Sequence, residues 1–294
     1  MTVNSEFKSG FIALIGRPNV GKSTLINSLI GQKITITSSR PQTTRHQVQG
    51  VLTLPGYQAV FIDTPGVHKP VDKMGEYLLE VALRALEEVD GVLFLVDGQY
   101  YPGGGDKYIA GLLKEVKTPI IGVVNKSDIS DDKKIAAYKP LLGEDCLAIS
   151  ALQGNNLEQL VQRITGILPP GPQYFPEDMI TDQPEQFIAA ELIREKAFRL
   201  TREEVPHSLA VEITGMQKRE GTDIVDLYAH IYVQRKSQKG IIIGQGGLRL
   251  KEIGQLARQD IEALLGSQVY LNLWVKVKKD WRDREEEMRR LGYR

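Results

Sequence analysis

The chain has 294 residues, in which 37 lysines and arginines balance 37 aspartates and glutamates, so its formal net charge is zero and broad electrostatic binding of nucleic acid is excluded. This length indicates two domains, each large enough to bury its own core. The apolar fraction of 41% and the charged fraction of 25% are those of an ordinary globular protein and exclude a disordered or fibrous chain.

The first part of the chain alternates short strand-like runs with segments that have apolar residues at helical spacing. Because neighbouring parallel strands need a crossover, this alternation predicts an α/β domain over residues 1–168 with a mainly parallel, doubly wound sheet. The predicted strands are Phe11–Ile15, Val48–Thr53, Ala59–Ile62, Val92–Val96, Ile120–Val124 and Leu147–Ile149.

Four prolines within eight residues, from Pro169 to Pro176, end this pattern. Proline at this density cannot continue a helix, so residues 169–178 are predicted to be a semi-rigid linker. The order then becomes helix, strand, strand, helix, helix, strand, which predicts a small α+β domain over residues 179–282, followed by a charged tail at 283–294. The predicted elements are a helix at Gln183–Thr201, strands at Ser208–Thr214 and Asp226–Val233, a helical pair at Ile241–Leu265 and a strand at Gln268–Val277.

The segment from Gly16 to Ser23 reads G-R-P-N-V-G-K-S and matches the phosphate-binding pattern G-x-x-x-x-G-K-[ST] between a predicted strand and a predicted helix. Backbone N–H groups of such a loop turn toward an anion, and the helix adds the positive end of its dipole. Lys22 is expected to reach the β- and γ-phosphates, and the Ser23 hydroxyl to ligate Mg²⁺. The predicted phosphate-binding residues are Gly16, Arg17, Pro18, Asn19, Val20, Gly21, Lys22, Ser23 and Thr24.

A second loop, Asp63-Thr64-Pro65-Gly66, follows the strand that ends at Ile62. A carboxylate at the end of a strand beside a phosphate loop suits Mg²⁺, commonly through a water molecule. Gly66 is expected to bring its backbone N–H close to a γ-phosphate. An Asp-x-x-Gly segment alone is a common turn, and its place downstream of the phosphate loop is what favours a metal site.

The segment Asn125-Lys126-Ser127-Asp128 follows the strand that ends at Val124 and is interpreted as a guanine-reading loop. The Asp128 carboxylate can accept hydrogen bonds from guanine N1–H and the exocyclic amine, whereas adenine presents an acceptor at N1. The Lys126 stem can lie over the base, and Asn125 can tie this loop to the phosphate loop. Ser150 and Ala151, after the last strand, can offer a backbone N–H to guanine O6. Each of these loops lies at the carboxyl end of a strand, where such sheets bind ligands.

Residues 11–167 therefore resemble a Ras-like GTPase domain. The resemblance implies a switch I threonine that ligates Mg²⁺ and contacts the γ-phosphate, for which Thr44 is the expected match and the adjacent Thr43 the alternative. Val67 stands where Ras-like enzymes place a glutamine that orients the attacking water, and valine cannot hydrogen-bond to water. We therefore expect slow intrinsic hydrolysis, with the water positioned by other groups, a potassium ion or a partner. The implied switch II residues are Asp63, Thr64, Pro65, Gly66 and Val67.

The segment Ile241-Ile-Ile-Gly244-Gln245-Gly246-Gly247 resembles the Ile-Gly-x-x-Gly loop of type II KH domains. Such a turn leaves room for a sugar-phosphate backbone and can clamp about four single-stranded nucleotides; a plain helix–helix turn is the alternative. Residues 228–282 hold ten basic and four acidic residues although the chain is neutral, which favours RNA contact here. Trp274 is predicted to belong to the core. The expected RNA-binding residues are Lys239, Gly244, Gln245, Gly246, Gly247, Arg249 and Lys251.

A GTPase with P-N-V-G-K-S, P-Q-T-T-R-H and D-T-P-G-V-H-K-P, joined to a KH domain, resembles the Era family over nearly the whole chain. The resemblance implies a switch that binds GTP and GDP with Mg²⁺, binds single-stranded 16S ribosomal RNA near its 3′ end and assists small (30S) ribosomal subunit assembly. It also implies a cytoplasmic protein that associates peripherally with the inner face of the cell membrane, and we expect a monomer.

Two other interpretations remain open. The first is a GTPase that acts on a protein or membrane partner and uses the KH-like domain as an interaction module without RNA. The second is an ATPase, which the Asp128 carboxylate argues against. The apolar runs are far shorter than the roughly 18 residues of a helix that spans a membrane, and no secretory signal pattern is visible. The single cysteine, Cys146, fits a reducing compartment. These features favour a cytoplasmic location.

Overall fold

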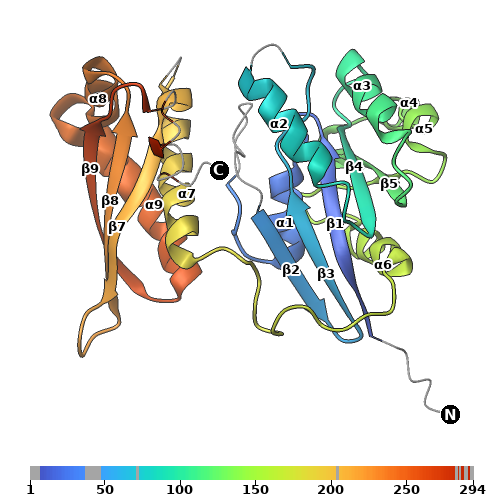
Figure 1. Ribbon diagram of the computed structural model, residues 1–294, viewed down its shortest axis with the longest axis horizontal. Helices are drawn as coiled ribbons and strands as arrows, with labels where there is room; N and C mark the ends of the chain where they lie inside the picture. Colours follow the sequence, from blue (N-terminus) through green and yellow to red (C-terminus); the bar gives the residue numbers. More distant parts are fainter. Residues whose placement is uncertain are drawn as a thin grey trace. The chain divides into compact units, whose positions relative to one another are not determined.

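The computed structural model describes residues 7–36, 48–70, 73–202, 205–281, 284, 286–287 and 291. The chain divides into two compact units, Met1–Asp182 and Gln183–Arg294, which are called the first and the second unit below (Figure 1). Each unit has its own sheet and its own buried apolar core.

The first unit is built on a six-stranded sheet with the order β2-β3-β1-β4-β5-β6. Neighbouring strands are parallel, except that β2 and β3 form an antiparallel hairpin, so the predicted mainly parallel sheet is confirmed. The hairpin needs no helical crossover, which is why no helix separates these two strands. The strands are β1 Lys8–Gly16, β2 Val48–Leu54, β3 Tyr57–Asp63, β4 Gly91–Asp97, β5 Ile120–Asn125 and β6 Leu147–Ala148.

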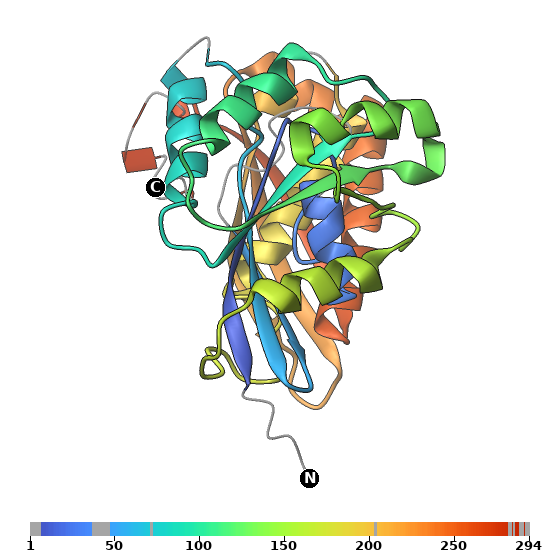
Figure 2. The same ribbon diagram turned by 90° about the vertical axis from the view of Figure 1, so that its right-hand side faces the viewer.

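Helices cover both faces of this sheet (Figure 2). Successive residues of β1 point to opposite faces, so Ile12 and Leu14 pack toward α1 and α6, whereas Ala13 and Ile15 pack toward α2 and α3. Both sets are buried, which explains the uninterrupted apolar runs of the central strands. The helices are α1 Lys22–Ile30, α2 Lys73–Arg84, α3 Gly104–Leu113, α4 Asp132–Ala137, α5 Lys139–Leu142 and α6 Leu157–Ile167.

The proline-rich segment after α6 is hydrogen-bonded along the first unit. The buried side chain of Gln58 on β3 accepts hydrogen bonds from the backbone N–H groups of Tyr174 (2.8 Å) and Phe175 (3.0 Å), and its Nε2 donates to the Phe175 carbonyl (2.9 Å). Farther along, the Val51 N–H on β2 donates to the Ile180 carbonyl at 2.9 Å. The chain is therefore held against two strands of the first unit before the second unit begins.

The second unit contains a three-stranded sheet with the order β7-β8-β9. Strands β7 and β8 are antiparallel, with a register shift between Ile213 and Gly215, and β8 and β9 are parallel. The predicted order of helix, strand, strand, helix, helix and strand is confirmed. The elements are α7 Glu185–Leu200, β7 Ala210–Lys218, β8 Ile224–Val233, α8 Lys236–Ile243, α9 Leu248–Leu265 and β9 Gln268–Val277.

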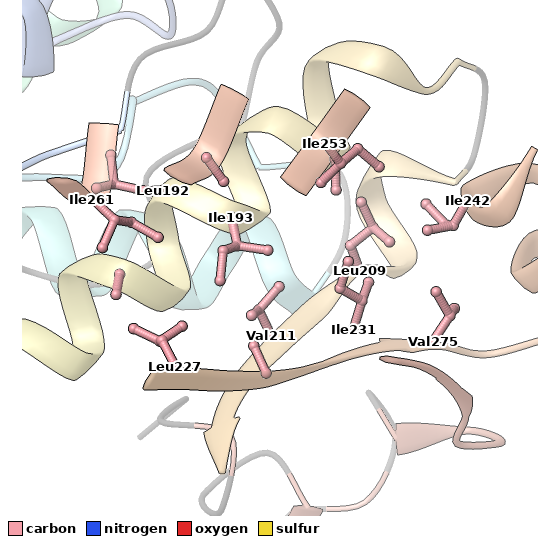
Figure 3. Close-up of a cluster of buried hydrophobic side chains, with 14 of the residues drawn as sticks. Leu192, Ile193, Leu209, Val211, Leu227, Ile231, Ile242, Ile253, Ile261 and Val275 are labelled. Carbon is pink, nitrogen blue, oxygen red and sulfur yellow. The ribbon is translucent and has the colours of Figure 1, made fainter. Parts of the chain in front are cut away.

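The core of the second unit lies between one face of this sheet and its helices. Figure 3 shows Leu192 and Ile193 of α7 and Ile261 of α9 above Leu227 and Ile231 of β8. All five side chains are buried, so α7 and α9 cover the same face of the sheet.

The prediction that Trp274 belongs to the core is wrong. Its side chain is 59% exposed, whereas Val269 and Val275 of the same strand are buried against the helices. Because side chains alternate along a strand, Trp274 lies on the opposite face from these valines. The buried tryptophan is Trp281, whose Nε1 donates to the Ser208 carbonyl at 3.0 Å.

The contacts of Gln58 generate the first prediction. Gln58→Ala leaves the N–H groups of Tyr174 and Phe175 without their acceptor, so we expect a loss of about 1–3 kcal/mol in the free energy of unfolding. Chymotrypsin is also expected to cut faster after Tyr174, whereas the bond after Phe175 is protected by Pro176 in both variants. The exposed Gln153→Ala is the matched control. Denaturant unfolding and limited proteolysis check both effects, and equal behaviour of the two variants would contradict the proposed role of Gln58.

Candidate functional site

The predicted phosphate-binding loop connects β1 to α1, as expected. The Lys22 ammonium group lies inside the curl of the loop, where its Nζ donates to the carbonyls of Gly16 and Arg17, both at 3.2 Å. Burial lowers the pKa of Lys22 to about 8, and attraction to the Asp63 carboxylate partly opposes this shift. An anion placed in the loop would stabilise the charged form of Lys22, because it supplies the counter-charge that burial removes.

The side chain of Arg17 extends from this loop to α3. Its Nη1 lies 3.3 Å from Oδ2 of Asp106, a buried carboxylate that also accepts the Gly103 N–H at 2.8 Å. Asp106 was not predicted as a site residue, although an acidic residue in the first turn of a helix is a recognisable capping signal. The other predicted loop residues lie where expected, with Asn19 exposed at a φ of 65°, Val20 buried and Thr24 half-buried in α1.

Two oxygen ligands lie side by side at the end of β3 and the start of α1. The Ser23 hydroxyl donates to Oδ2 of Asp63 at 2.7 Å, and Asp63 is fully buried. A hydroxyl and a carboxylate are hard oxygen donors, so this pair fits Mg²⁺ that is also bound by nucleotide phosphates. The predicted third ligand, Thr44, and its alternative Thr43 lie outside the described residues.

The loop after β3 packs directly on the phosphate-binding loop. The Thr64 hydroxyl donates to the Leu14 carbonyl at 2.5 Å, and the Val67 N–H donates to the Gly16 carbonyl at 3.0 Å. A Cβ atom on Gly66 would lie 2.6 Å from Cα of Pro18, so only glycine allows this approach. The side chain of Val67 is buried in the cluster that packs α2 and α3 on the sheet.

Asn125 joins three of the predicted loops. Its Nδ2 donates to the Val20 carbonyl at 2.8 Å, and its Oδ1 accepts the Ala151 N–H at 2.9 Å. A Cβ atom on Gly21, whose φ is 100°, would lie 2.2 Å from Nδ2 of Asn125. The expected tie between the base-reading loop and the phosphate loop is therefore present, and it includes the loop at Ser150, which is buried. In this arrangement the Ala151 N–H, expected to meet guanine O6, is donated to Asn125.

The Lys126 side chain is anchored at the end of β4. Its Nζ lies 2.5 Å from Oδ2 of Asp97 and 3.4 Å from Oε1 of Gln99. Asp97 was missed as a site residue, although it ends a strand in the same way as Asp63. Asp128, the predicted guanine ligand, is exposed in the short 3-10 turn Ser127–Ile129 and available to a ligand.

The predicted RNA-binding turn lies between α8 and α9. Gly244, Gly246 and Gly247 have φ values of 74°, 58° and 79°, which bulky residues adopt only with strain. Gln245 and Gly246 are exposed, and the Arg249 guanidinium donates to the Ile241 carbonyl at 2.5 Å, which braces the turn.

A groove of about 430 Å³ runs beside this turn, between α9 and β9. Of the predicted RNA-binding residues, Gly247 and Lys251 line it, while Lys239, Gly244, Gln245, Gly246 and Arg249 belong to α8, the turn and the first turn of α9. Gly254 also lines the groove and was not predicted as a site residue. A glycine on the face of a helix that packs toward a strand could have indicated the groove, because it has no side chain to fill the space. The lining residues are Gly247, Leu250, Lys251, Gly254, Gln255, Arg258, Val269, Tyr270, Leu271 and Leu273.

Two family models match the chain. The model described as "50S ribosome-binding GTPase" matches residues 11–126, and the model described as "KH domain" matches residues 204–282. The first covers the phosphate loop and the loop after β3, and the second covers the glycine-rich turn and the groove.

Full-length relatives share both parts. GTPase Era of Alkaliphilus oremlandii is 54% identical, over 98% of this chain and 99% of the relative, and GTPase Era of Halothermothrix orenii is 52% identical, over 98% and 99%. A crystal structure of Era in complex with MgGDPNP and nucleotides 1506–1542 of 16S ribosomal RNA has a TM-score of 0.90 and 44% identity, over 98% of this chain and 99% of that chain. A crystal structure of a single-residue variant of Aquifex aeolicus Era bound to GDP·AlF4⁻ matches with the same TM-score, identity and coverage.

The two hydrogen bonds of Asn125 generate the second prediction. Asn125→Ala removes the link between the Val20 carbonyl and the Ala151 N–H, so we expect the affinity for GDP to fall about tenfold or more. Fluorescence titration with a labelled nucleotide measures this change. The exposed Asn155→Ala is the matched control and is expected to bind normally. An unaltered affinity of the Asn125 variant would show that the loops hold their positions without this side chain.

Proposed function

Because the chain belongs to the Era family of GTPases, we propose that it is a GTP-hydrolysing switch that binds single-stranded 16S ribosomal RNA near its 3′ end and assists small ribosomal subunit assembly. The observation that carries this proposal is that one chain holds nucleotide-binding loops joined by Asn125 and by the Ser23–Asp63 contact, and also a Gly244–Gly247 turn beside a groove. The Era structure with MgGDPNP and nucleotides 1506–1542 of 16S ribosomal RNA supports it.

At the nucleotide, the residues of this chain bind and neutralise the phosphates. Ser23 and Asp63 would hold Mg²⁺, together with Thr44 or Thr43, and Lys22 would place its ammonium group against the β- and γ-phosphates. The ion neutralises charge that develops on the transferring phosphoryl group. Asp128 accepts the two guanine N–H groups, while the Asp97–Lys126 contact holds the Lys126 stem at the base.

Water must be positioned for hydrolysis without the residue that performs this task in Ras-like enzymes. Val67 has an apolar side chain, and that side chain is buried in the core rather than available to the nucleotide. We assign the task to another group of the site, aided by a potassium ion whose charge stabilises the transition state. Intrinsic hydrolysis is therefore slow.

In RNA binding, the turn and the groove contact different parts of the RNA. The turn from Gly244 to Gly247 accepts the sugar-phosphate backbone, because its glycines present no side chains. Lys251 and Arg258 line the groove and meet phosphates, while Leu250 and Leu273 provide apolar walls for the bases.

The contacts of β2 suggest how nucleotide state reaches the RNA-binding unit. Strand β2 begins directly after residues 37–47, which contain the switch I threonines. On this strand the Gln49 N–H donates to Oδ1 of Asp182 at 3.2 Å, and Asp182 lies three residues before α7 begins at Glu185. Ordering of switch I by GTP therefore acts on a strand that holds the end of the connecting segment, and we propose different RNA affinities in the two nucleotide states.

We further propose a monomer that works in the cytoplasm and associates peripherally with the inner face of the cell membrane. Among the helices of the described residues, none is both long and apolar enough to span a membrane.

Substitution of the turn tests the RNA proposal. Replacing Gln245 and Gly246 together by aspartate places two carboxylates against the RNA backbone, so we expect RNA affinity to fall about a hundredfold or more, with GTP affinity unchanged. Aspartate tolerates the left-handed conformation of Gly246, so the fold should survive. The assay is fluorescence anisotropy with an oligonucleotide from the 3′ end of 16S ribosomal RNA, and Gln153→Asp is the control.

Retained RNA binding in this double variant would instead favour a GTPase whose second unit contacts a protein or membrane partner. Equal RNA affinities of the wild-type chain with GDP and with a non-hydrolysable GTP analogue would contradict the coupling through β2.

Hydrolysis rates test the consequence of Val67. We expect the purified chain alone to turn over at well below roughly 1 s⁻¹ and to be faster in potassium than in sodium chloride at equal ionic strength. Val67→Gln should not raise the rate, because the new amide would enter the core cluster rather than reach the nucleotide. The hydrolysis rates are measured as phosphate release in both salts, for the wild-type chain and for Val67→Gln. A rate near 1 s⁻¹ would refute slow hydrolysis, and equal rates in the two salts would refute the role of potassium.

A further inference from the structure

The second unit exposes three aromatic rings on the face of its sheet opposite α7 and α9. Tyr228 on β8 is 37% exposed, and Tyr270 and Trp274 on β9 are 49% and 59% exposed. They alternate with the buried Leu227, Ala229 and other residues that pack against the helices, so all three point away from the core. We call the surface formed by Tyr228, Tyr270 and Trp274 the aromatic face. It is not part of the groove between α9 and β9, apart from Tyr270, which borders both.

The strand register fixes the spacing between these three rings. Tyr270 pairs with Asp226 and Trp274 pairs with His230, so Tyr228 lies on the neighbouring strand midway between the two rings of β9. With strands about 4.8 Å apart and a rise of about 3.3 Å per residue, the diagonal separation of the Cα atoms is roughly 8 Å. Successive nucleotides of an extended single strand can therefore meet successive rings, as bases do on the aromatic residues of other RNA-binding sheets.

The polar groups around the rings suit a polyanion. The Arg219 guanidinium lies 5.2 Å from the centre of the Tyr270 ring and is held there by two hydrogen bonds to Asp226, at 2.6 and 2.7 Å. Lys276 is exposed on the same face, two residues beyond Trp274. The Asp226 carboxylate is engaged by Arg219, and Glu212 on β7 accepts a hydrogen bond from the Tyr232 hydroxyl at 2.6 Å. The face therefore carries the ion-paired Arg219 guanidinium against Tyr270 and the exposed Lys276 ammonium group beyond Trp274, and both can contact phosphate groups.

The aromatic face is continuous with the groove through one strand. Strand β9 is the edge of the sheet, and its Leu271 and Leu273 line the groove while Tyr270 and Trp274 belong to the aromatic face. A polynucleotide that leaves the groove and crosses this edge reaches the rings directly. The mixture of aromatic rings, cations and the Asn272 amide on this face suits the bases and phosphates of a nucleic acid.

We propose that the aromatic face is a second binding site for single-stranded RNA, on which bases of the strand that leaves the groove stack against Tyr228, Tyr270 and Trp274. The inference rests on the proposed binding of RNA in the groove and extends the recognised length beyond the roughly four nucleotides that a Gly-x-x-Gly turn clamps. In this proposal the exposed Trp274 increases the affinity for longer RNA strands. Each base that stacks on an aromatic ring adds binding energy, whatever the identity of the base.

Trp274→Ala tests the proposal, because an exposed side chain can be removed without opening a cavity. We expect affinity for a twelve-nucleotide single strand from the 3′ end of 16S ribosomal RNA to fall about fivefold to a hundredfold. Affinities for its four-nucleotide fragments that fit the groove, and for GTP, should be unchanged. Trp274→Phe keeps a stacking ring and should retain most of the affinity for the longer strand. Equal affinities of wild type and Trp274→Ala for the longer strand would overturn the proposal.

Tryptophan fluorescence provides a direct readout of stacking. The chain has two tryptophans, and Trp281 is buried with its indole N–H bonded to Ser208, so quenching by RNA reports on Trp274. We expect the longer strand to quench the wild-type emission and the Trp274→Phe variant to bind without quenching. Binding of the longer strand without any quenching in the wild-type chain would also overturn the proposal.

The same measurements separate this inference from the function on which it rests. If the aspartate double variant of the turn lost all RNA binding and Trp274→Ala had no effect, the proposal that RNA binds in the groove would stand. The proposal that RNA also binds the aromatic face would be rejected. Retention of RNA binding by the turn variant would reject the groove. If Trp274→Ala instead abolished self-association in sedimentation experiments while RNA affinity was unchanged, the face would be an interface between copies of the chain and the proposal would be wrong.

Discussion

The buried amide of Asn125 is the interaction on which the nucleotide site depends. The phosphate loop, the base-reading loop and the loop at Ala151 are distant in sequence, and Val20 and Asn125 are 105 residues apart. One side chain donates to the first loop and accepts from the third, so the separation between the phosphate and base positions is set by its length. The absence of a side chain at Gly21 is part of the same constraint, since any Cβ atom there would collide with the amide.

The RNA-binding surface of the second unit differs from the nucleotide site in burial and charge. The nucleotide loops bring buried polar groups together, whereas the Gly244–Gly247 turn lies beside a groove between α9 and β9. The charge distribution matches this difference. Residues 171–227 hold six basic and twelve acidic residues, and residues 228–282 hold ten and four, so the neutral total conceals a basic segment of the chain. In the proposed mode of binding, affinity for RNA depends on shape and stacking more than on long-range attraction.

Much of the fold and of the nucleotide site was predictable because motif spacing and strand order constrain each other. A loop that follows a parallel strand must lie at the carboxyl edge of the sheet, so the motifs converge whatever the details of packing. Asp97 obeys the same rule and was overlooked because it belongs to no familiar motif. Asp106 was overlooked because a helix cap and a ligand of Arg17 look alike in sequence. Trp274 was misassigned because tryptophan is apolar enough to suggest burial, although the alternation of β9 places it on the other face.

The sequence by itself determined the order of the elements, the two kinds of site and the absence of the water-positioning glutamine at Val67, because these follow from residue identity and spacing along the chain. The tertiary structure decided which distant groups meet: Asn125 with Val20 and Ala151, Arg17 with Asp106, and Gln58 with the proline-rich segment. It also decided that three aromatic rings are exposed on the same face of one sheet. Such contacts depend on strand register and on the burial of particular side chains, and both are settled only when the whole chain packs.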